Sequence, residues 1–125
     1  MIFSSLQKAG AGVALVTIVV MAYSAHAGDG VAADIEKGAE IYAGTCIACH
    51  GENGKGGDIP GVPDFTSPKG PLGKPDAVLF DHILNGFQSP GSDFEMPELG
   101  GNEDMTEQDI INVMAYLRAK FQSRK

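Results

Sequence analysis

The pentapeptide Cys46-Ile47-Ala48-Cys49-His50 constrains this chain more than any other stretch, because it brings two thiols and an imidazole together within a few residues. The C-x-x-C-H pattern is typical of covalent c-type haem attachment. Its spacing lets the two sulfurs bond to the two vinyl groups of one haem and leaves His50 beneath the iron. The pattern therefore predicts one covalent haem c, attached through Cys46 and Cys49, with His50 as the proximal iron ligand.

Three other interpretations of the two cysteines compete with haem attachment. A thioredoxin-like dithiol would need a βαβ setting, and no run typical of a strand lies beside the motif. A zinc site would need four ligands, yet the sequence has no further cysteine, and His82 is the one other histidine after residue 27. A structural disulfide suits an oxidising compartment, but the cysteines lie close together and a histidine follows them directly.

The N-terminal residues are typical of a cleavable secretion signal. Lys8 precedes an apolar run over residues 9–23, and Ala25-His26-Ala27 is a small-x-small cleavage site. The apolar run is short for a membrane span, which needs about 20 residues. We therefore expect residues 1–27 to be a signal peptide, with export to the periplasm and no stable membrane anchor after cleavage. The mature domain is expected over residues 28–125.

The chain is acidic, with 16 Asp and Glu against 9 Lys and Arg in 125 residues. Cleavage after Ala27 would remove Lys8 alone among the charged residues and leave a net charge of −8 on 98 residues. Nucleic-acid phosphates would repel such a surface, so nucleic acid is not an expected partner. A redox protein with a basic docking patch would instead be attracted to it, mainly through faster encounter. A mature chain of this length suits one small domain, whose limited core would be centred on the haem.

Helical periodicity is confined to three segments of the mature chain. The first is expected to begin after the N-cap Asp34, to place Gly38 and Tyr42 on one face, and to deliver the pentapeptide at its C-terminal end. The second is expected over residues 75–85. The third is expected over residues 106–121, where it opens on a capping pattern.

The stretches between these helices are expected to be loops. Residues 51–74 hold seven glycines and four prolines, a composition typical of loop. Because they also carry the apolar residues Ile59, Val62, Phe65 and Leu72, we expect this loop to wrap the edge of the haem. Gly86 fits the C-cap of the second helix. Residues 87–105 form a second loop, and no convincing alternating strand is expected in the chain.

The second axial ligand must come from Met96, Met105, Met114 or His82, unless the site is open. Met114 falls on the apolar stripe of the last helix, and Met105 lies beside a helix N-cap, so packing explains both. Met96 lies in a loop and precedes Pro97, which stiffens the backbone and restricts Met96 to extended geometry. We therefore expect Met96 as the sixth ligand, with His82 or an open site as the alternatives.

Taken in order, these features resemble a class I c-type cytochrome across essentially the whole mature chain. The matching pieces are the first helix with Gly38 and Tyr42, Cys46-x-x-Cys49-His50, Ile59-Pro60-Gly61-Val62-Pro63-Asp64-Phe65, Ile83-Leu84-Asn85-Gly86, Met96-Pro97 and Tyr116-Leu117. The resemblance implies an all-α fold, with three to four helices wrapped around one covalently attached haem. It implies that the first and last helices cross at Gly38 and Tyr116. It also implies that a loop proline carbonyl accepts the ring N–H of His50, and we expect Pro63 in this role, with Pro60 as the alternative.

The resemblance also implies a function. If His50 and Met96 fill both axial positions, no substrate reaches the iron, and the methionine sulfur raises the reduction potential. The expected function is one-electron transfer between periplasmic or membrane redox partners, by a protein that is not itself an enzyme. Two alternatives stay open: an electron-transfer subunit of a larger oxidoreductase, and a haem enzyme or gas sensor with an open sixth site.

Overall fold

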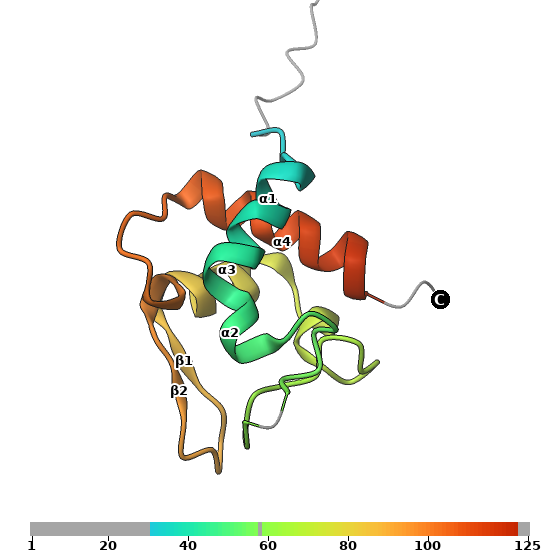
Figure 1. The fold of residues 1–125 in the computed structure, drawn as a ribbon, viewed down its shortest axis with the longest axis vertical. Coiled ribbons are helices and arrows are strands. Elements are labelled where there is room, and N and C mark those ends of the chain that lie inside the picture. The colour runs from blue at the N-terminus through green and yellow to red at the C-terminus, as the bar shows by residue number, and fades with distance from the viewer. Residues whose placement is uncertain (1–30, 58, 123–125) are drawn as a thin grey trace, which may run out of the picture.

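The computed structural model describes residues 31–57 and 59–122, so the predicted signal peptide lies outside the described residues. Helices dominate the fold in these ranges: α1 (Ile35–Ile41), α2 (Ile47–His50), α3 (Asp76–Asn85) and α4 (Glu107–Phe121) (Figure 1). The predicted all-α class is confirmed, since the described strands form only one short antiparallel pair. Within the same ranges, no helix is both long enough and apolar enough to cross a membrane.

The first helix has the predicted start and end. The Asp34 side chain accepts a hydrogen bond from the Lys37 N–H at 3.0 Å and caps α1. The chain then passes through a π-helical turn, Tyr42–Cys46, into α2. Wide turns of this kind inside a helix are frequent at functional sites. This one carries Cys46, so the helix delivers the pentapeptide at its C-terminal end, as predicted.

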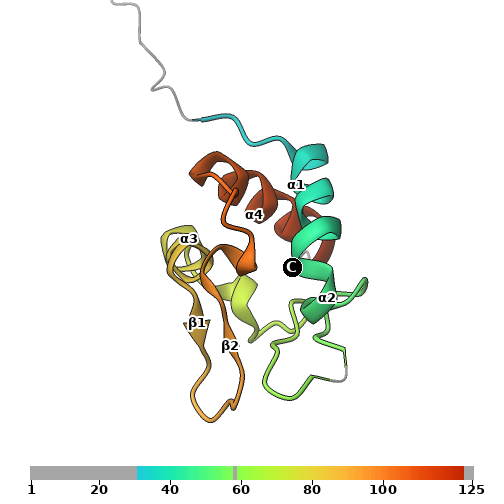
Figure 2. The ribbon, with the colours of Figure 1, turned by 60° about the vertical axis from the view of Figure 1, so that its left-hand side comes forward.

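Helices α1 and α4 cross where α1 carries Gly38, and both ribbon views show the contact (Figures 1 and 2). A Cβ atom on Gly38 would overlap the Asn112 carbonyl oxygen and lie 2.9 Å from the Tyr116 Cβ. Asn112 is itself buried, and its side-chain oxygen accepts a hydrogen bond from the Asp34 N–H at 2.9 Å. The crossing at Gly38 and Tyr116 is therefore confirmed, and it needs glycine at position 38 because the two backbones come so close.

Helix α4 supplies most of the core. It opens on the predicted capping box, in which Thr106 Oγ1 accepts from the Asp109 N–H and the Asp109 carboxylate accepts from the Thr106 N–H. Its buried apolar residues are Ile110, Val113, Met114, Leu117 and Phe121. They pack with residues from the rest of the chain, including Tyr42, Phe65, Leu72, Leu79 and Met105. The predicted packing role of Met114 is confirmed.

The loop over residues 51–74 is fastened to the core at several points. Phe65 and Leu72 are buried, as predicted for apolar anchors, and Ile59 and Val62 are half-buried. The Arg118 guanidinium of α4 donates to the Leu72 carbonyl at 2.8 Å and to the Lys74 carbonyl at 3.0 Å. These bonds hold the end of the loop against α4, immediately before α3 begins.

The prediction that residues 87–105 form a loop without strands was wrong. Strand β1 (Phe87–Gln88) pairs antiparallel with β2 (Glu95–Met96), and Phe87 lies opposite Met96. A 3₁₀ turn, Glu98–Gly101, follows. Each strand has only two residues, which is too short for an alternating pattern to be recognised in a sequence. The hairpin matters because it carries Met96.

The helix crossing can be tested by adding one methyl group. Gly38→Ala should lower the free energy of unfolding by about 1–3 kcal/mol, the usual cost of overpacking a close contact. Gly44→Ala is the matched control, since no atom lies within 4 Å of a Cβ at Gly44. There, alanine should be neutral or stabilising by about 0.5–1 kcal/mol, because glycine is the weaker helix former. Guanidinium unfolding compares the two variants, and equal stabilities would contradict a close crossing at Gly38.

Candidate haem site

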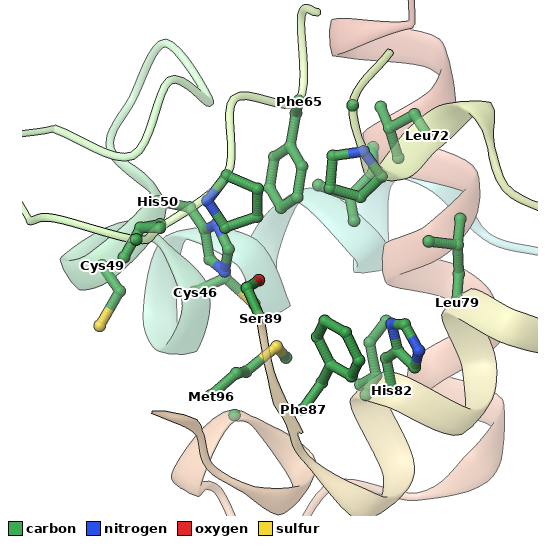
Figure 3. Close-up of a pocket in the computed structure, with 18 of the residues that line it drawn as sticks. Cys46, Cys49, His50, Phe65, Leu72, Leu79, His82, Phe87, Ser89 and Met96 are labelled. Carbon is green, nitrogen blue, oxygen red and sulfur yellow. The ribbon is translucent and has the colours of Figure 1, made fainter. Parts of the chain in front are cut away.

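A cavity of about 690 Å³ lies between the pentapeptide, the loop over residues 51–74 and the β hairpin (Figure 3). This volume falls within the range of roughly 300–1,000 Å³ that is usual for ligand and cofactor pockets. Many of its walls are apolar, among them Phe65, Leu72, Leu79, Val113 and Leu117. All of the predicted site residues line it: Cys46, Cys49, His50, Pro63 and Met96. The fold therefore brings together residues that are 50 positions apart in the sequence.

The imidazole of His50 is buried and stacks on Phe65, with 4.4 Å between ring centroids and 18° between ring planes. Burial lowers the pKa of His50 to about 4. The ring is therefore neutral near pH 7, which is the form that binds a metal ion. Its Nδ1 atom is buried and has no hydrogen-bond partner among the described residues. The predicted bond from this ring to the Pro63 carbonyl stays a prediction, although Pro63 lines the same cavity.

The Cys46 thiol lacks the lowered pKa that is typical of a redox-active dithiol. Cys46 is half-buried and Cys49 is exposed, and both thiols are free. Burial, with a smaller contribution from Cys49, raises the pKa of the Cys46 thiol to about 11. Reactive C-x-x-C dithiols have a lowered thiol pKa instead. The zinc interpretation also loses support, since the described residues contain no cluster of three or more His, Cys, Asp or Glu side chains that could hold a metal ion.

Met96 lies across the cavity from His50. Figure 3 shows the Met96 side chain on the hairpin and the His50 ring on α2, both lining the same cavity. His82 also lines the cavity, but its ring stacks on Phe87, with centroids 3.8 Å apart and planes at 9°. Met105 lines the cavity as well, yet it is buried in the core, with 7% of its surface exposed. Of the candidates for a second axial ligand, Met96 lines the cavity without the ring stacking of His82 or the core burial of Met105.

The segment that bears Met96 is held in place by close backbone contacts. Gly86 has a φ of 76°, and a Cβ there would lie 2.7 Å from the Met96 carbonyl oxygen and 2.9 Å from the Glu98 nitrogen. Only glycine accommodates both this conformation and this approach. Farther along the chain, the Asn102 side-chain amide donates to Thr45 Oγ1 at 3.2 Å. The end of the hairpin therefore packs on the end of α3, and the segment after the following 3₁₀ turn is tied to the turn that carries Cys46.

Tyr42 fixes the backbone directly after His50. Its hydroxyl donates to the Gly51 carbonyl at 2.6 Å, directly after His50 in the chain. Its ring packs at 5.4 Å from both Tyr116 and Phe121. Burial, with smaller effects of Cys46 and Tyr116, raises the pKa of Tyr42 to about 12. The hydroxyl therefore stays protonated and remains a donor, which fixes the C-terminal end of α2 and with it His50.

Three contacts of the site were missed from the sequence. The bond from Tyr42 to Gly51 has a backbone acceptor nine residues away, which no motif marks. The stacking of Phe65 on His50 was missed as well, although Phe65 was expected to be an apolar anchor. The stacking of Phe87 on His82 was missed because the hairpin was not predicted. An aromatic residue directly after the helix-ending Gly86 was the one available signal.

A haem fits the residues present. Apolar walls suit its flat hydrophobic ring, and two free thiols in a C-x-x-C-H motif are available for thioether bonds. The unpartnered imidazole of His50 and the thioether of Met96 are both ligands that haem iron accepts. A cavity of this kind would be a costly void in so small a domain if nothing filled it.

The sequence matches a known protein family over residues 33–117, which is more than half of the chain. The family is described as cytochrome c oxidase, cbb3-type, subunit III. The matched region begins just before α1, ends within α4 and includes every predicted site residue.

Curated proteins with similar sequences include subunits named FixP of cbb3-type cytochrome c oxidase. The chain is 42% identical over 53 residues to FixP of a Bradyrhizobium species and 43% identical over 51 residues to FixP of Azorhizobium caulinodans. These matches cover 42% and 41% of this chain but only 18% and 17% of the relatives, so the chain spans less than a fifth of their length. Cytochrome c-555 of Prosthecochloris aestuarii is 27% identical over 86 residues, which cover 67% of this chain and 85% of that protein.

The support of the hairpin by Gly86 can be tested against a matched glycine. Gly86 and Gly91 have φ values of 76° and 80°, so alanine strains the backbone at both positions. Only at Gly86 would the new Cβ also overlap neighbouring atoms; nothing lies within 4 Å at Gly91. Gly86→Ala should therefore cost about 1–3 kcal/mol more than Gly91→Ala, with faster amide hydrogen exchange at Met96. Equal effects in unfolding and exchange would contradict this role.

Proposed function

Because the chain belongs to the c-type cytochromes, in the family described as cytochrome c oxidase, cbb3-type, subunit III, we propose that it is a one-electron carrier with a His50–Met96 ligated haem. Its cofactor is one covalently attached haem c, and electron transfer through that haem is what the family relationship supports. The His50–Met96 ligation rests on one observation: both side chains line the same apolar cavity (Figure 3).

Each residue of the site has a proposed role. Cys46 and Cys49 hold the haem through thioether bonds, while His50 and Met96 are its axial ligands. When bound, the haem supplies a one-electron ferric–ferrous couple at its iron. His50 offers a neutral nitrogen lone pair, because burial lowers its pKa, and the stacked Phe65 ring restricts its orientation. Pro63 is the proposed acceptor for the other ring N–H, which would fix the tautomer of His50 and raise its donor strength.

The side of the cavity that carries Met96 explains why we propose an electron carrier rather than an enzyme. Met96 would fill the sixth position, so that no substrate or gas reaches the metal. The Met96 backbone packs against Gly86, and the segment that follows is held by the hydrogen bond between Asn102 and Thr45. A fixed ligand segment means that little has to rearrange when an electron arrives or leaves. The apolar walls and the methionine sulfur both favour the reduced state and raise the potential.

A cellular location and a class of redox partner are also proposed for the protein. We propose that residues 1–27 are removed on export and that residues 28–125 act on the periplasmic side. The partners are redox proteins with a basic docking patch, because residues 28–125 carry a net charge of −8. The matches to FixP favour one second candidate, in which this domain is the electron entry or exit of a larger oxidoreductase.

Covalent attachment can be tested by removing both thiols. Cys46→Ala combined with Cys49→Ala should abolish haem that stays on the polypeptide after denaturation and acidic organic extraction, because no thioether can form. Each single variant is the control and should retain one bond, with less haem. The readout is haem absorbance of the extracted polypeptide, and haem retained by the double variant would place attachment elsewhere.

The axial role of Met96 can be tested with two matched substitutions. Met96→Leu should open the sixth position, so that carbon monoxide binds the ferrous protein at least about tenfold more tightly, since apparent affinity follows the fraction of open sites. Met105→Leu is the control, because Met105 lines the same cavity but is assigned to packing. Carbon monoxide titration followed by absorbance gives the affinities. The assignment is wrong if Met105→Leu opens the site and Met96→Leu does not.

A further inference from the structure

Phe94 lies at the mouth of the cavity. It is among the lining residues, yet 55% of its surface is exposed. Over residues 31–57 and 59–122, the exposed large hydrophobic residues are Val31, Ile35, Val78 and Phe94, and Phe94 alone among them is aromatic. An exposed aromatic ring at the opening of a functional cavity differs from the scattered aliphatic residues of an ordinary surface, because aromatic rings are enriched at protein interfaces.

The hairpin holds the Phe94 backbone in a defined position. Ser92 Oγ accepts a hydrogen bond from the Phe94 N–H at 3.1 Å and donates to the Phe94 carbonyl at 2.9 Å. The Gln88 side chain donates to the Ser92 carbonyl at 2.8 Å. The hairpin turn also packs on the loop across the cavity, since a Cβ on Gly61 would lie 2.8 Å from the Ser92 Cβ. The ring is therefore presented from an ordered support, which lowers the entropy cost of contact with a partner.

The chain segment that carries Phe94 is acidic, whereas Lys69 and Lys74 line the same cavity from the loop over residues 51–74. Asp93 and Glu95 flank it in the sequence, and both are exposed. Residues 75–117 contain nine Asp and Glu and no Lys or Arg. Both ribbon views place the hairpin turn at the opposite end of the molecule from the start of α1 (Figures 1 and 2). An apolar ring between two carboxylates complements a positively charged surface with an apolar pocket.

We infer that Asp93, Phe94 and Glu95 form the docking site for the redox partner, a protein with an apolar pocket ringed by Lys and Arg beside its own redox centre. The Phe94 ring enters that pocket, and the two carboxylates pair with the surrounding cations. Docking there brings the partner to the mouth of the cavity, where one electron passes from the reduced cytochrome to the oxidised partner with no bond made or broken. This inference rests on the proposed electron-carrier function.

Three small one-electron reagents separate the contributions of charge and of the ring. Tris(phenanthroline)cobalt(III) is a cationic, aromatic oxidant; hexaammineruthenium(II) is a cationic reductant without an aromatic surface; hexacyanoferrate(III) is an anionic oxidant. Second-order rate constants are measured at low and high salt for the haem-loaded protein. The variants are Phe94→Ser and the pair Asp93→Asn with Glu95→Gln. The controls are Ile35→Ser, at a similarly exposed residue of α1, and the pair Glu36→Gln with Glu40→Gln, which removes the same charge from α1.

We expect Phe94→Ser to lower the rate constant for the phenanthroline reagent at least about threefold and to leave the rate constant for the ammine reagent unchanged. The acidic pair at the hairpin should slow both cationic reagents at least about threefold at low salt and speed the anionic one, and high salt should remove these effects. The controls on α1 should change these rates much less. If the two acidic pairs have equal effects, or if Phe94→Ser matches Ile35→Ser, the docking site is not at the hairpin.

A second readout does not depend on electron transfer. The redox-inert, paramagnetic cation tris(ethylenediamine)chromium(III) should broaden the amide signals of residues 93–95 in the ferrous protein before those of residues 36–40. Broadening that is strongest on α1 would overturn the inference. If the wild-type protein exchanges electrons with none of the three reagents, the electron-carrier proposal fails instead, whatever the broadening shows.

Discussion

The crossing of α1 and α4 is the contact on which the rest of the structure depends. Because Gly38 has no side chain, the α4 backbone comes within van der Waals distance of α1, and Tyr42 packs one turn later against Tyr116 and Phe121. The Tyr42 hydroxyl then bonds the Gly51 carbonyl directly after His50. The position of His50, the proposed proximal ligand, thus depends on the helix crossing at Gly38.

A second close backbone contact supports the segment that carries Met96. Gly86 ends α3 with a positive φ and lets the Met96 backbone pass within contact distance, while Asn102 bonds back to Thr45 beside the pentapeptide. The close backbone approaches at Gly38 and Gly86 therefore support the two segments that carry the proposed ligands. The protein atoms packed around His50 bury its imidazole and keep it neutral. Packing is thereby linked directly to the capacity to bind a metal.

Sequence patterns predicted the parts of the fold that have a local signal. Helical periodicity and caps predicted the helices. The C-x-x-C-H spacing predicts Cys46, Cys49 and His50 as attachment and ligand residues, because attachment chemistry needs those residues at that spacing. Met96 was preferred to Met105 and Met114 because it precedes Pro97 in a loop, and its role as a ligand stays a prediction. The hairpin was missed because its strands have two residues each. The stacking of Phe65 on His50 was missed because it joins segments that only the folded chain brings together.

We propose that one cavity holds a haem between His50 and Met96. The measurement that tests it most directly is the absorption spectrum of the wild-type protein, oxidised and reduced, after production in a host that attaches c-type haem. Ligation of the haem by His50 and Met96 predicts sharp low-spin bands in the reduced state and the weak far-red sulfur-to-iron band in the oxidised state. A high-spin spectrum without the far-red band would contradict it and would indicate an open sixth site.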